Sequence, residues 1–476
     1  MSKYKDLAMN TMILAVGTFG SKILAFFLTR LYTTHMDANI LGNKELIEIT
    51  ANFLIPVFTF AVSESVIRYG LDKDFDNKQV FSTAMIVQFF GMGIMLLLSP
   101  ILSSVPFIQG YTMLLMLYVI VSALRQTSSL FVRSIGFMKI YALDGILATL
   151  SLFLFNLFFI SYLDLGLTGF MLSMISSDFC SVIFLTITTK LWKNFSVKAA
   201  DKDITKTMLR FSIPMIPTSV MWIITGFSDR LFIKYLRGPD GEVGHEAAGI
   251  YTAASKIPNL VSMVSTVFFQ AWNMSAITEY GSKGIGKFYQ KVFSAYQSIM
   301  YIASAGIILF VDVLSRMLLN YSAHPEYARA PEYTPVLVLS VLIMCFNMFL
   351  SSIYTAAQHT KNSFWTSLIV TVLNLILNYF LVIKFGIHGA IATTFISYIV
   401  CYIIRIIDAR RYIYFKVDHT FTAINIAALL ALAIIKVKEP PHYAVYIGLL
   451  FTFILIINFR AVITMANKVL RRGRRS

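Results

Sequence analysis

Long apolar runs alternate with short polar segments from residue 8 almost to the C-terminus. A bilayer core about 30 Å thick is crossed by a helix of about 20 apolar residues, so each run predicts a transmembrane helix. We therefore predict an all-α, polytopic membrane protein with about 14 transmembrane helices. The predicted spans are residues 8–33, 46–69, 80–102, 111–132, 141–163, 166–189, 208–236, 248–272, 288–312, 333–356, 365–385, 387–408, 420–437 and 443–464.

Short motifs recur in the two halves of this pattern and indicate an internal duplication. Each half has an arginine near the outer end of its first helix and an Ile-Pro pair in its second helix. Each half also has an asparagine before a Gly-x-x-Gly motif that joins its last two helices. The matching segments are residues 29–32 and 229–232, Ile55-Pro56 and Ile257-Pro258, and Asn156 with residues 166–169 against Asn378 with residues 386–389.

The duplication predicts how the chain is divided. Because the matched arginines lie near the same membrane face, the repeat is parallel, about an axis along the membrane normal. We predict an N-terminal six-helix lobe at residues 1–206 and a C-terminal six-helix lobe at residues 207–412. Two extra transmembrane helices and a basic cytoplasmic tail then occupy residues 413–476. Two such lobes can rock about a central cavity, as alternating access requires.

Composition agrees with a bilayer environment and explains the excess of basic residues. Of the 476 residues, 57% are hydrophobic and 13% charged, against about 45–50% and about 25% in soluble domains. The net charge of +16 is carried by Lys and Arg placed between apolar runs, which favours membrane topology over nucleic-acid binding. We predict no nucleic-acid partner.

The positive-inside rule sets the predicted orientation. With the N-terminus in the cytoplasm, more than half of the 40 Lys and Arg residues fall on inner loops and flanks, Arg405 among them. Few fall outside, and Lys44 is one of these. An even number of spans then places both termini in the cytoplasm and makes the chain a multi-pass protein of the cell membrane.

The loops leave little room for catalysis. None exceeds about 20 residues, whereas a soluble catalytic domain needs about 50 residues or more. Cys180, Cys345 and Cys401 lie within apolar runs, and neither they nor the histidines have metal-ligand spacing. We predict that the chain is no enzyme and that it has no metal site and no cofactor.

Charged residues inside the spans are the candidate functional residues. Such a residue costs roughly 2.5–3.5 kcal/mol near the bilayer centre and usually faces a cavity or a partner. Cations outnumber carboxylates here, which suits an anionic cargo such as a diphosphate. The predicted substrate-binding residues are Lys22, Arg30, Arg125, Arg230 and Lys256, and the candidates for ion coupling or charge pairing are Glu64, Asp178 and Asp229.

Alternatives stay open for several of these residues. Arg30 and Arg230 can either face the lumen or extend to the outer interface. Glu64 lies four residues before Arg68 and can pair with it. Asp178 suits a proton or cation role and a structural hydrogen bond equally. Asp144, by contrast, is expected near an interface, outside this set.

Two stretches resemble a known transporter family. The segments Ser228–Trp272 and Ile55–Gly70, together with the two Gly-x-x-Gly motifs, resemble the oligosaccharide flippases of the multidrug/oligosaccharidyl-lipid/polysaccharide exporter superfamily. This resemblance implies a V-shaped pair of six-helix lobes around a cationic cavity. The cavity would take the diphosphate and sugars of a lipid-linked glycan while its polyprenyl chain stays in lipid.

The related lipid II flippases add detail at the level of residues. They have a basic residue after a serine in the first helix, as Lys22 follows Ser21 here, and basic residues in the second and eighth helices. Arg68 and Lys256 match those two positions approximately. The multidrug branch uses a cation-binding carboxylate in the first helix, and residues 8–33 contain none.

The function implied by the resemblance is lipid-linked glycan transport. We expect a flippase that moves an undecaprenyl-diphosphate-linked oligosaccharide across the cytoplasmic membrane by alternating access, for surface polysaccharide biosynthesis. Its partners would be the lipid-linked glycan, the bilayer and a polysaccharide polymerase machinery. The alternatives are a lipid II flippase and a cation-coupled multidrug exporter. A membrane glycosyl polymerase or ligase would need catalytic residues on a substantial external loop.

Overall fold

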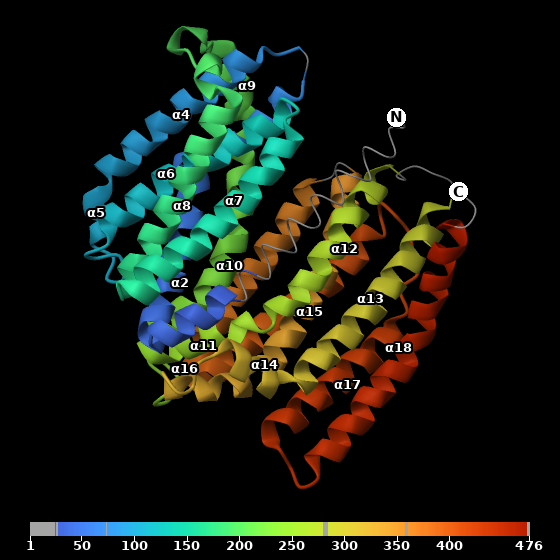
Figure 1. Cartoon of the computed structure of the whole chain (residues 1–476). Coiled ribbons are helices and arrows are strands. Elements are labelled where there is room, and N and C mark those ends of the chain that lie inside the picture. The colour runs from blue at the N-terminus through green and yellow to red at the C-terminus, as the bar shows by residue number, and fades with distance from the viewer. Residues whose placement is uncertain (1–23, 25–26, 73, 279–283, 358–359, 474–476) are drawn as a thin grey trace. The chain divides into compact units, whose positions relative to one another are not determined.

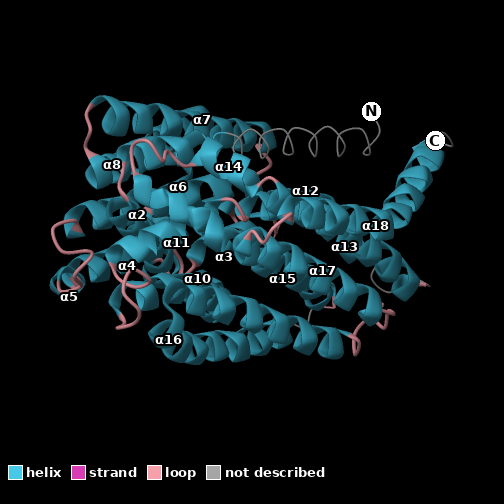
Figure 2. Ribbon diagram, turned by 90° about the horizontal axis from the view of Figure 1, so that it is seen from below, coloured by secondary structure: helices cyan, strands magenta, loops and turns pink. Residues whose placement is uncertain are grey.

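Helices joined by short loops make up the part of the chain that the structure describes (Figure 2). The computed structural model describes residues 24, 27–72, 74–278, 284–357 and 360–473. No β-strand occurs within these ranges. The predicted all-α fold is therefore confirmed.

The chain divides into two compact units, with the boundary between Phe227 and Ser228. This boundary falls inside a helix, α10 (Ile216–Tyr235). The predicted lobe boundaries at 206/207 and 412/413 stay predictions. Unit 1 contains helical residues 27–35 and then α2 (Ala38–Phe58), α3 (Val62–Gly70), α4 (Asn77–Leu97), α5 (Ser99–Ser103), α6 (Thr112–Ser134), α7 (Met138–Asn156), α8 (Gly166–Thr189) and α9 (Lys202–Ser212).

Unit 2 takes up the rest of α10 and the eight helices after it (Figure 1). Its hydrophobic core is built by α12, α13, α15, α16, α17 and α18. The helices are α11 (His245–Lys256), α12 (Asn259–Thr278), α13 (Ile285–Leu309), α14 (Val311–Leu318), α15 (Ala330–Ala356), α16 (Thr360–Ala409), α17 (His419–Lys438) and α18 (Tyr443–Gly473).

Several helices have the length and composition of membrane spans. Within the described residues, 8 helices pass this test, or up to 9 when α2 and α3 are joined across their 60° bend. Lipid-facing side chains fit this assignment, because Phe90 and Leu97 of α4 are 66% and 81% exposed. The chain is a multi-pass membrane protein, whereas the number of about 14 spans stays a prediction.

Prolines interrupt three of the predicted spans. Span 46–69 is broken after α2, which contains Pro56. Span 248–272 is divided at Pro258, between α11 and α12. Span 208–236 begins instead as α9 and continues as α10 after a 3-10 turn that contains Pro214. Each proline lacks the N–H that would continue the helical hydrogen bonds, so the helix bends or ends nearby.

The two Gly-x-x-Gly motifs have the same local geometry in their two units. Gly166 and Gly386 have positive φ angles of 49° and 56°, which glycine adopts at low cost. At the fourth position, a Cβ on Gly169 would lie 2.9 Å, and one on Gly389 2.0 Å, from a backbone carbonyl oxygen of the preceding segment. The missing side chains therefore let the helix that follows each turn pass close to the chain before it.

The core of unit 1 lies between α3, α4, α6, α8 and α9. Phe81 of α4 and Phe131 of α6 pack with ring centroids 4.5 Å apart. Ser65 of α3 donates a hydrogen bond of 2.8 Å to the carbonyl of Met208 in α9. The short helix α9, which precedes the predicted seventh span, is thus part of the N-terminal core.

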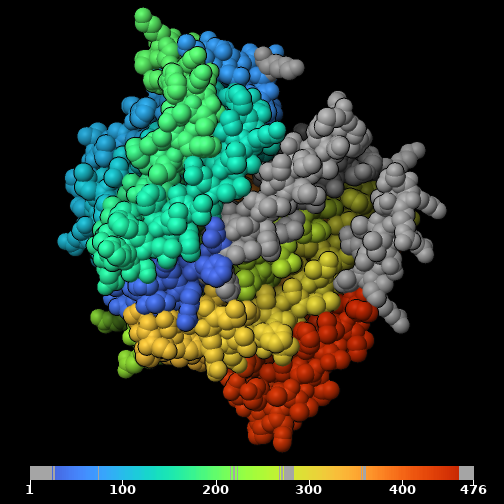
Figure 3. Space-filling view, viewed as in Figure 1, coloured from blue at the N-terminus to red at the C-terminus, as the bar shows by residue number. Residues whose placement is uncertain are grey.

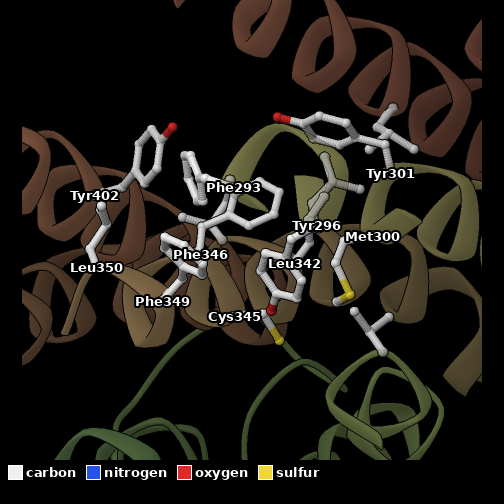
Figure 4. Packing of buried hydrophobic residues seen from close by; sticks show 14 of the residues in the cluster. Phe293, Tyr296, Met300, Tyr301, Leu342, Cys345, Phe346, Phe349, Leu350 and Tyr402 are labelled. Atoms are coloured by element: carbon white, nitrogen blue, oxygen red, sulfur yellow. The ribbon is translucent and has the colours of Figure 1, made fainter. Parts of the chain in front are cut away.

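The core of unit 2 is larger and richer in aromatic rings (Figure 4). Phe349 of α15 stacks against Trp272 of α12, with centroids 4.7 Å apart, and contacts Phe293 of α13 at the same distance. The Trp272 indole donates a 2.9 Å hydrogen bond to Ser352 Oγ. α17 and α18 pack against α13 (Figure 3). The last two helices are therefore integral to unit 2.

Candidate functional site

Ionisable side chains in unit 1 form a network between α6, α7 and α8. Arg125 of α6 donates from Nη1 to Asp178 Oδ1 of α8 at 2.8 Å, and its Nε donates to Ser181 Oγ at 3.1 Å. Asp144 of α7 accepts hydrogen bonds from Ser181 and, at 3.2 Å, from Ser129. Asp144 and Asp178 are 1% and 4% exposed. The network is therefore a buried ion cluster that ties three helices together.

This network changes the reading of two predicted site residues. Asp178 is engaged in charge pairing, one of the two roles predicted for it, and its partner is Arg125. The Arg125 guanidinium serves two carboxylates, since its Nε also lies 4.0 Å from Asp144 Oδ2. Asp144 itself is buried against α6 and α8, and its expected place near a membrane interface stays a prediction.

The sequence contains a signal for this cluster that the charge inventory missed. Ser122, Arg125 and Ser129 are spaced at i, i+3 and i+7, which places them on one face of α6. Ser177, Asp178 and Ser181 form a similar polar group on α8. Three polar positions on one helical face indicate a polar interhelical contact, whereas an isolated charge does not.

A second buried cluster lies around Lys44 of α2. The Lys44 side chain is 5% exposed and forms ion pairs with Glu48 and, at 3.8 Å, with Glu45. Its Nζ also lies 4.9 Å from the ring centroid of Tyr32 and 4.4 Å from that of Phe170. Lys44 lies within α2, which begins at Ala38, and not in a loop before the helix, while its predicted location on the outer side stays a prediction.

Of the two cations predicted in the first helix, the structure describes one. Arg30 lies in helical residues 27–35 and is half-buried. Lys22, the deepest cation predicted from the sequence, lies outside the described residues. Whether these two side chains face a common lumen therefore stays a prediction.

Glu64 lines a cavity of about 270 Å³ in unit 1, at the bend between α2 and α3. Its polar lining consists of Glu64, Ser63, Asn52 and Gln126. Within the described residues, no ion pair joins Glu64 to Arg68, whose side chain is exposed. Glu64 therefore faces a small polar space at a helix break instead of pairing along its own helix.

The bend beside this cavity has an unusual backbone. Phe60 and Ala61 have φ angles of 54° and 49°, and non-glycine residues in this region cost on the order of 1–3 kcal/mol each. Ala61 N donates to the Pro56 carbonyl at 2.8 Å. The proline and these two residues together turn α3 by 60° from α2, which brings Glu64 to the cavity.

Asp229 is the centre of a buried polar cluster in unit 2. The residue is 3% exposed, and its carboxylate accepts hydrogen bonds from Tyr251 at 2.7 Å, Thr394 at 2.6 Å and Asn378 at 2.6 Å. Tyr251 lies in α11, and Asn378 and Thr394 lie in α16, before and after its break at Gly386. The asparagine before the second Gly-x-x-Gly motif thus contacts the acidic residue of the matching Asp-Arg motif.

The two predicted substrate-binding cations of unit 2, Arg230 and Lys256, lie on α10 and α11. Arg230 is half-buried, donates from Nε to Thr252 Oγ1 at 3.3 Å, and lies 5.5 Å from the Tyr251 ring centroid. Lys256 is the last residue of α11, next to the break at Pro258, and is also half-buried. Arg230 and Asp229 share the contact with Tyr251, so the structure brings these two predicted residues into one polar region.

Arg405 is a cation near the end of α16 that is 0% exposed. Its predicted place on an inner flank stays a prediction, but its side chain is buried among other helices. Its guanidinium donates to the Asn347 carbonyl at 2.9 Å, to Ser367 Oγ at 3.0 Å and to Thr366 Oγ1 at 3.2 Å. These contacts hold α15 and the two parts of α16 together.

The sequence predicted no metal site. Within the described ranges, no group of three or more His, Cys, Asp or Glu side chains gathers in a way that could hold a metal ion. The oxygen-rich surroundings of Asp229 and Glu64 each contain a single carboxylate.

Two protein families match this chain. The family described as polysaccharide biosynthesis protein matches residues 7–273, which is more than half of the chain. The MatE family matches residues 240–380. A comparison with curated proteins found no match.

Solved structures of similar fold are transporters. An inward-facing multidrug resistance MATE family transporter of the MOP superfamily has a TM-score of 0.61 and 14% identity, over 84% of this chain and 98% of that one. An outward-facing one has a TM-score of 0.59 and 16% identity, over 89% and 96%. A MOP superfamily transporter from Pyrococcus furiosus has a TM-score of 0.59 and 14% identity, over 85% and 96%, and a binding pocket described as reversed in polarity.

The fold and the family matches lead to the same assignment. The chain and the solved transporters share an all-α fold over most of their length, as the resemblance to the multidrug/oligosaccharidyl-lipid/polysaccharide exporters implies. The chain belongs to the polysaccharide biosynthesis protein family, and its fold is similar to that of membrane transporters of the MOP superfamily.

Proposed function

We propose that this protein is a flippase that moves an undecaprenyl-diphosphate-linked oligosaccharide across the cell membrane for surface polysaccharide biosynthesis. The observation that supports this most is the polysaccharide biosynthesis family match over residues 7–273. The cargo is amphipathic, and a transporter in the plane of the bilayer needs to shield only its headgroup. The polymerase that uses the flipped glycan would be the partner on the outer side.

The proposed headgroup contacts are Lys22, Arg30, Arg230 and Lys256. A diphosphate carries about two negative charges and accepts charge-assisted hydrogen bonds from such side chains. Arg125 leaves the substrate set, because its charge is engaged by Asp178 and Asp144.

Glu64 and Asp229 are the proposed residues for ion coupling. Asp229 has neutral donors on three sides, and Glu64 lines a polar cavity at a helix break. A carboxylate in such surroundings can exchange a proton or a monovalent cation as the helices move. Either residue would thereby link ion movement to the opening of its unit.

A cation-coupled multidrug exporter is the second candidate function. The MatE match over residues 240–380 and the fold shared with multidrug resistance transporters favour it. A lipid II flippase of the same architecture is a third candidate. The three functions differ in cargo, so a transport assay with purified components separates them.

The experiment uses proteoliposomes that contain a polyprenyl-diphosphate-linked oligosaccharide in both leaflets. An externally added glycosidase digests only the outer-leaflet glycan when no protein is present. With the full-length protein, we expect digestion to proceed to completion. Uptake of a fluorescent organic cation with no glycan movement would overturn the proposal in favour of the exporter, and movement of lipid II alone would favour the lipid II flippase.

The cationic contacts are tested in the same assay. Arg230→Ala should reduce glycan movement at least tenfold at unchanged protein abundance, because one charge-assisted contact to the diphosphate is lost. Arg237→Ala is the matched control, since Arg237 is an exposed arginine of the loop that follows α10. Wild-type transport by Arg230→Ala would show that this side chain extends to the outer interface and does not contact cargo.

A further inference from the structure

The ion cluster between α6, α7 and α8 contains unequal numbers of opposite charges. One guanidinium, that of Arg125, faces the carboxylates of Asp144 and Asp178. All three helices have the length and composition of membrane spans. If both carboxylates were ionised, the cluster would hold an uncompensated negative charge in a buried site within the bilayer.

The two carboxylates are not equivalent. Asp178 accepts a hydrogen bond of 2.8 Å from Arg125 Nη1 and a further hydrogen bond from Ser122. Asp144 has no direct hydrogen bond from Arg125; the closest approach, from Nε to Oδ2, is 4.0 Å. Ser181 stands between them, accepting from Arg125 and donating to Asp144. Asp178 is therefore the carboxylate with the full ionic partner.

Among the residues that the structure describes, Arg125 is the cation that faces Asp144. The charged groups that face it from the helices packed on α7 are Arg125 of α6 and Asp178 of α8. One turn earlier on α7, Tyr141 is covered by Arg133 of α6, whose Cζ lies 5.4 Å from the ring centroid. A buried carboxylate without a cation of its own is neutralised most simply by a proton.

We propose that Asp144 is a proton-binding site, and that loss of its proton draws Arg125 from Asp178 towards Asp144. With Asp144 protonated, Arg125 pairs with Asp178 and the cluster is neutral. With Asp144 ionised, the two carboxylates compete for one guanidinium, and the short path through Ser181 lets Arg125 shift between them. No bond other than O–H is made or broken, and the proton is exchanged with water.

Exchange of the Asp144 proton affects how α7 is attached to α6 and α8. Within the described part of the chain, the buried residues of α7 are Asp144, Ala148 and Asn156, and only 22% of this span is buried. The helix packs along α8, and Asp144 is one of the few side chains that it buries there. A change in its protonation alters one of the main attachments of α7, whichever cargo the protein carries.

The test measures protonated carboxyl groups by infrared difference spectroscopy on the purified full-length protein in lipid, without cargo. We expect a carboxylic-acid C=O band that disappears as the pH is raised. The band should be absent in Asp144→Asn. It should also be absent in Asp178→Asn, because one guanidinium then faces one carboxylate. Asp74→Asn, at an exposed loop position, should keep it.

Two results would overturn the proposal. One is a wild-type protein without such a band at any pH, and the other is an Asp144→Asn or Asp178→Asn spectrum that keeps every carboxylic-acid band of the wild type, since bands of Glu64 and Asp229 are unaffected by either change. Thermal unfolding of each variant checks that it is folded. Because no glycan is present, a negative result in the glycan-transport assay leaves this measurement unaffected, and the two proposals fail independently.

Discussion

Charged residues inside this protein are expensive, and most of those described are matched by polar partners in their own unit. Arg125 has two carboxylates, Lys44 has two glutamates and two aromatic faces, and Asp229 has three neutral donors. A cation in a span is therefore weak evidence of substrate contact by itself. The charged side chains available for binding cargo are those whose charge is not balanced by an ion pair within the protein.

Arg405 illustrates the structural use of a buried cation and gives the first prediction. Arg405→Ala removes three hydrogen bonds and leaves a cavity between α15 and α16, so we expect it to destabilise the protein by about 2–4 kcal/mol. Thermal unfolding in detergent measures the effect. Arg411→Ala is the control, since its side chain is 74% exposed and a surface ion pair contributes about 0–1 kcal/mol. Equal melting temperatures for the two variants would contradict the structural role.

At the scale of elements, helix breaks occur where prolines and glycines stand in the motifs of the duplication. Pro56 and Pro258 mark the breaks after α2 and between α11 and α12. Gly166 and Gly386 provide the left-handed turns that bring a helix back beside the preceding segment. The sequence motifs are thus explained by backbone geometry, and the ionisable side chains are positioned by it.

The second Gly-x-x-Gly motif gives a prediction at this scale. In Gly389→Ala, the new Cβ would lie 2.0 Å from the Leu381 carbonyl oxygen, and overpacking of this kind costs about 1–3 kcal/mol. Gly306→Ala in α13 is the matched control, because its Cβ would meet no atom within 4 Å and alanine favours the helix. We expect thermal unfolding at lower temperature for Gly389→Ala only. Similar stability of both variants would show that the two segments can separate without loss.

At the scale of the whole molecule, orientation in the membrane is the property on which the proposed direction of transport depends. The charge bias predicts that reporter fusions at Lys198 and Ser476 lie in the cytoplasm and that a fusion at Gly241 lies outside. Activity of an alkaline phosphatase fusion, which requires the outer side, measures this. The opposite pattern would invert the proposed orientation, and with it the leaflet from which the cargo is taken.

Hydrophobic patterning was enough to predict the fold class and the positions of most helices. Apolar runs of about 20 residues have few structural alternatives in a bilayer, and for this reason span 166–189 coincides with α8. Helix interruptions were harder to place, since a proline in a span can bend the helix or end it. The predicted spans 46–69 and 248–272 each became two helices.

Only the tertiary structure decided which charges are available for a site. Pairing depends on side chains brought together from different helices. Asp144 of α7 and Asp178 of α8 both face Arg125 of α6. Thr394 donates a hydrogen bond to Asp229 from a position 165 residues away in sequence. Hydrophobic periodicity records which face of a helix is apolar, but it carries no information on the neighbour that this face meets. The burial of Lys44 and Arg405 could not be predicted for the same reason, because neighbouring helices decide whether a charged side chain near a helix end is solvated or surrounded by polar partners.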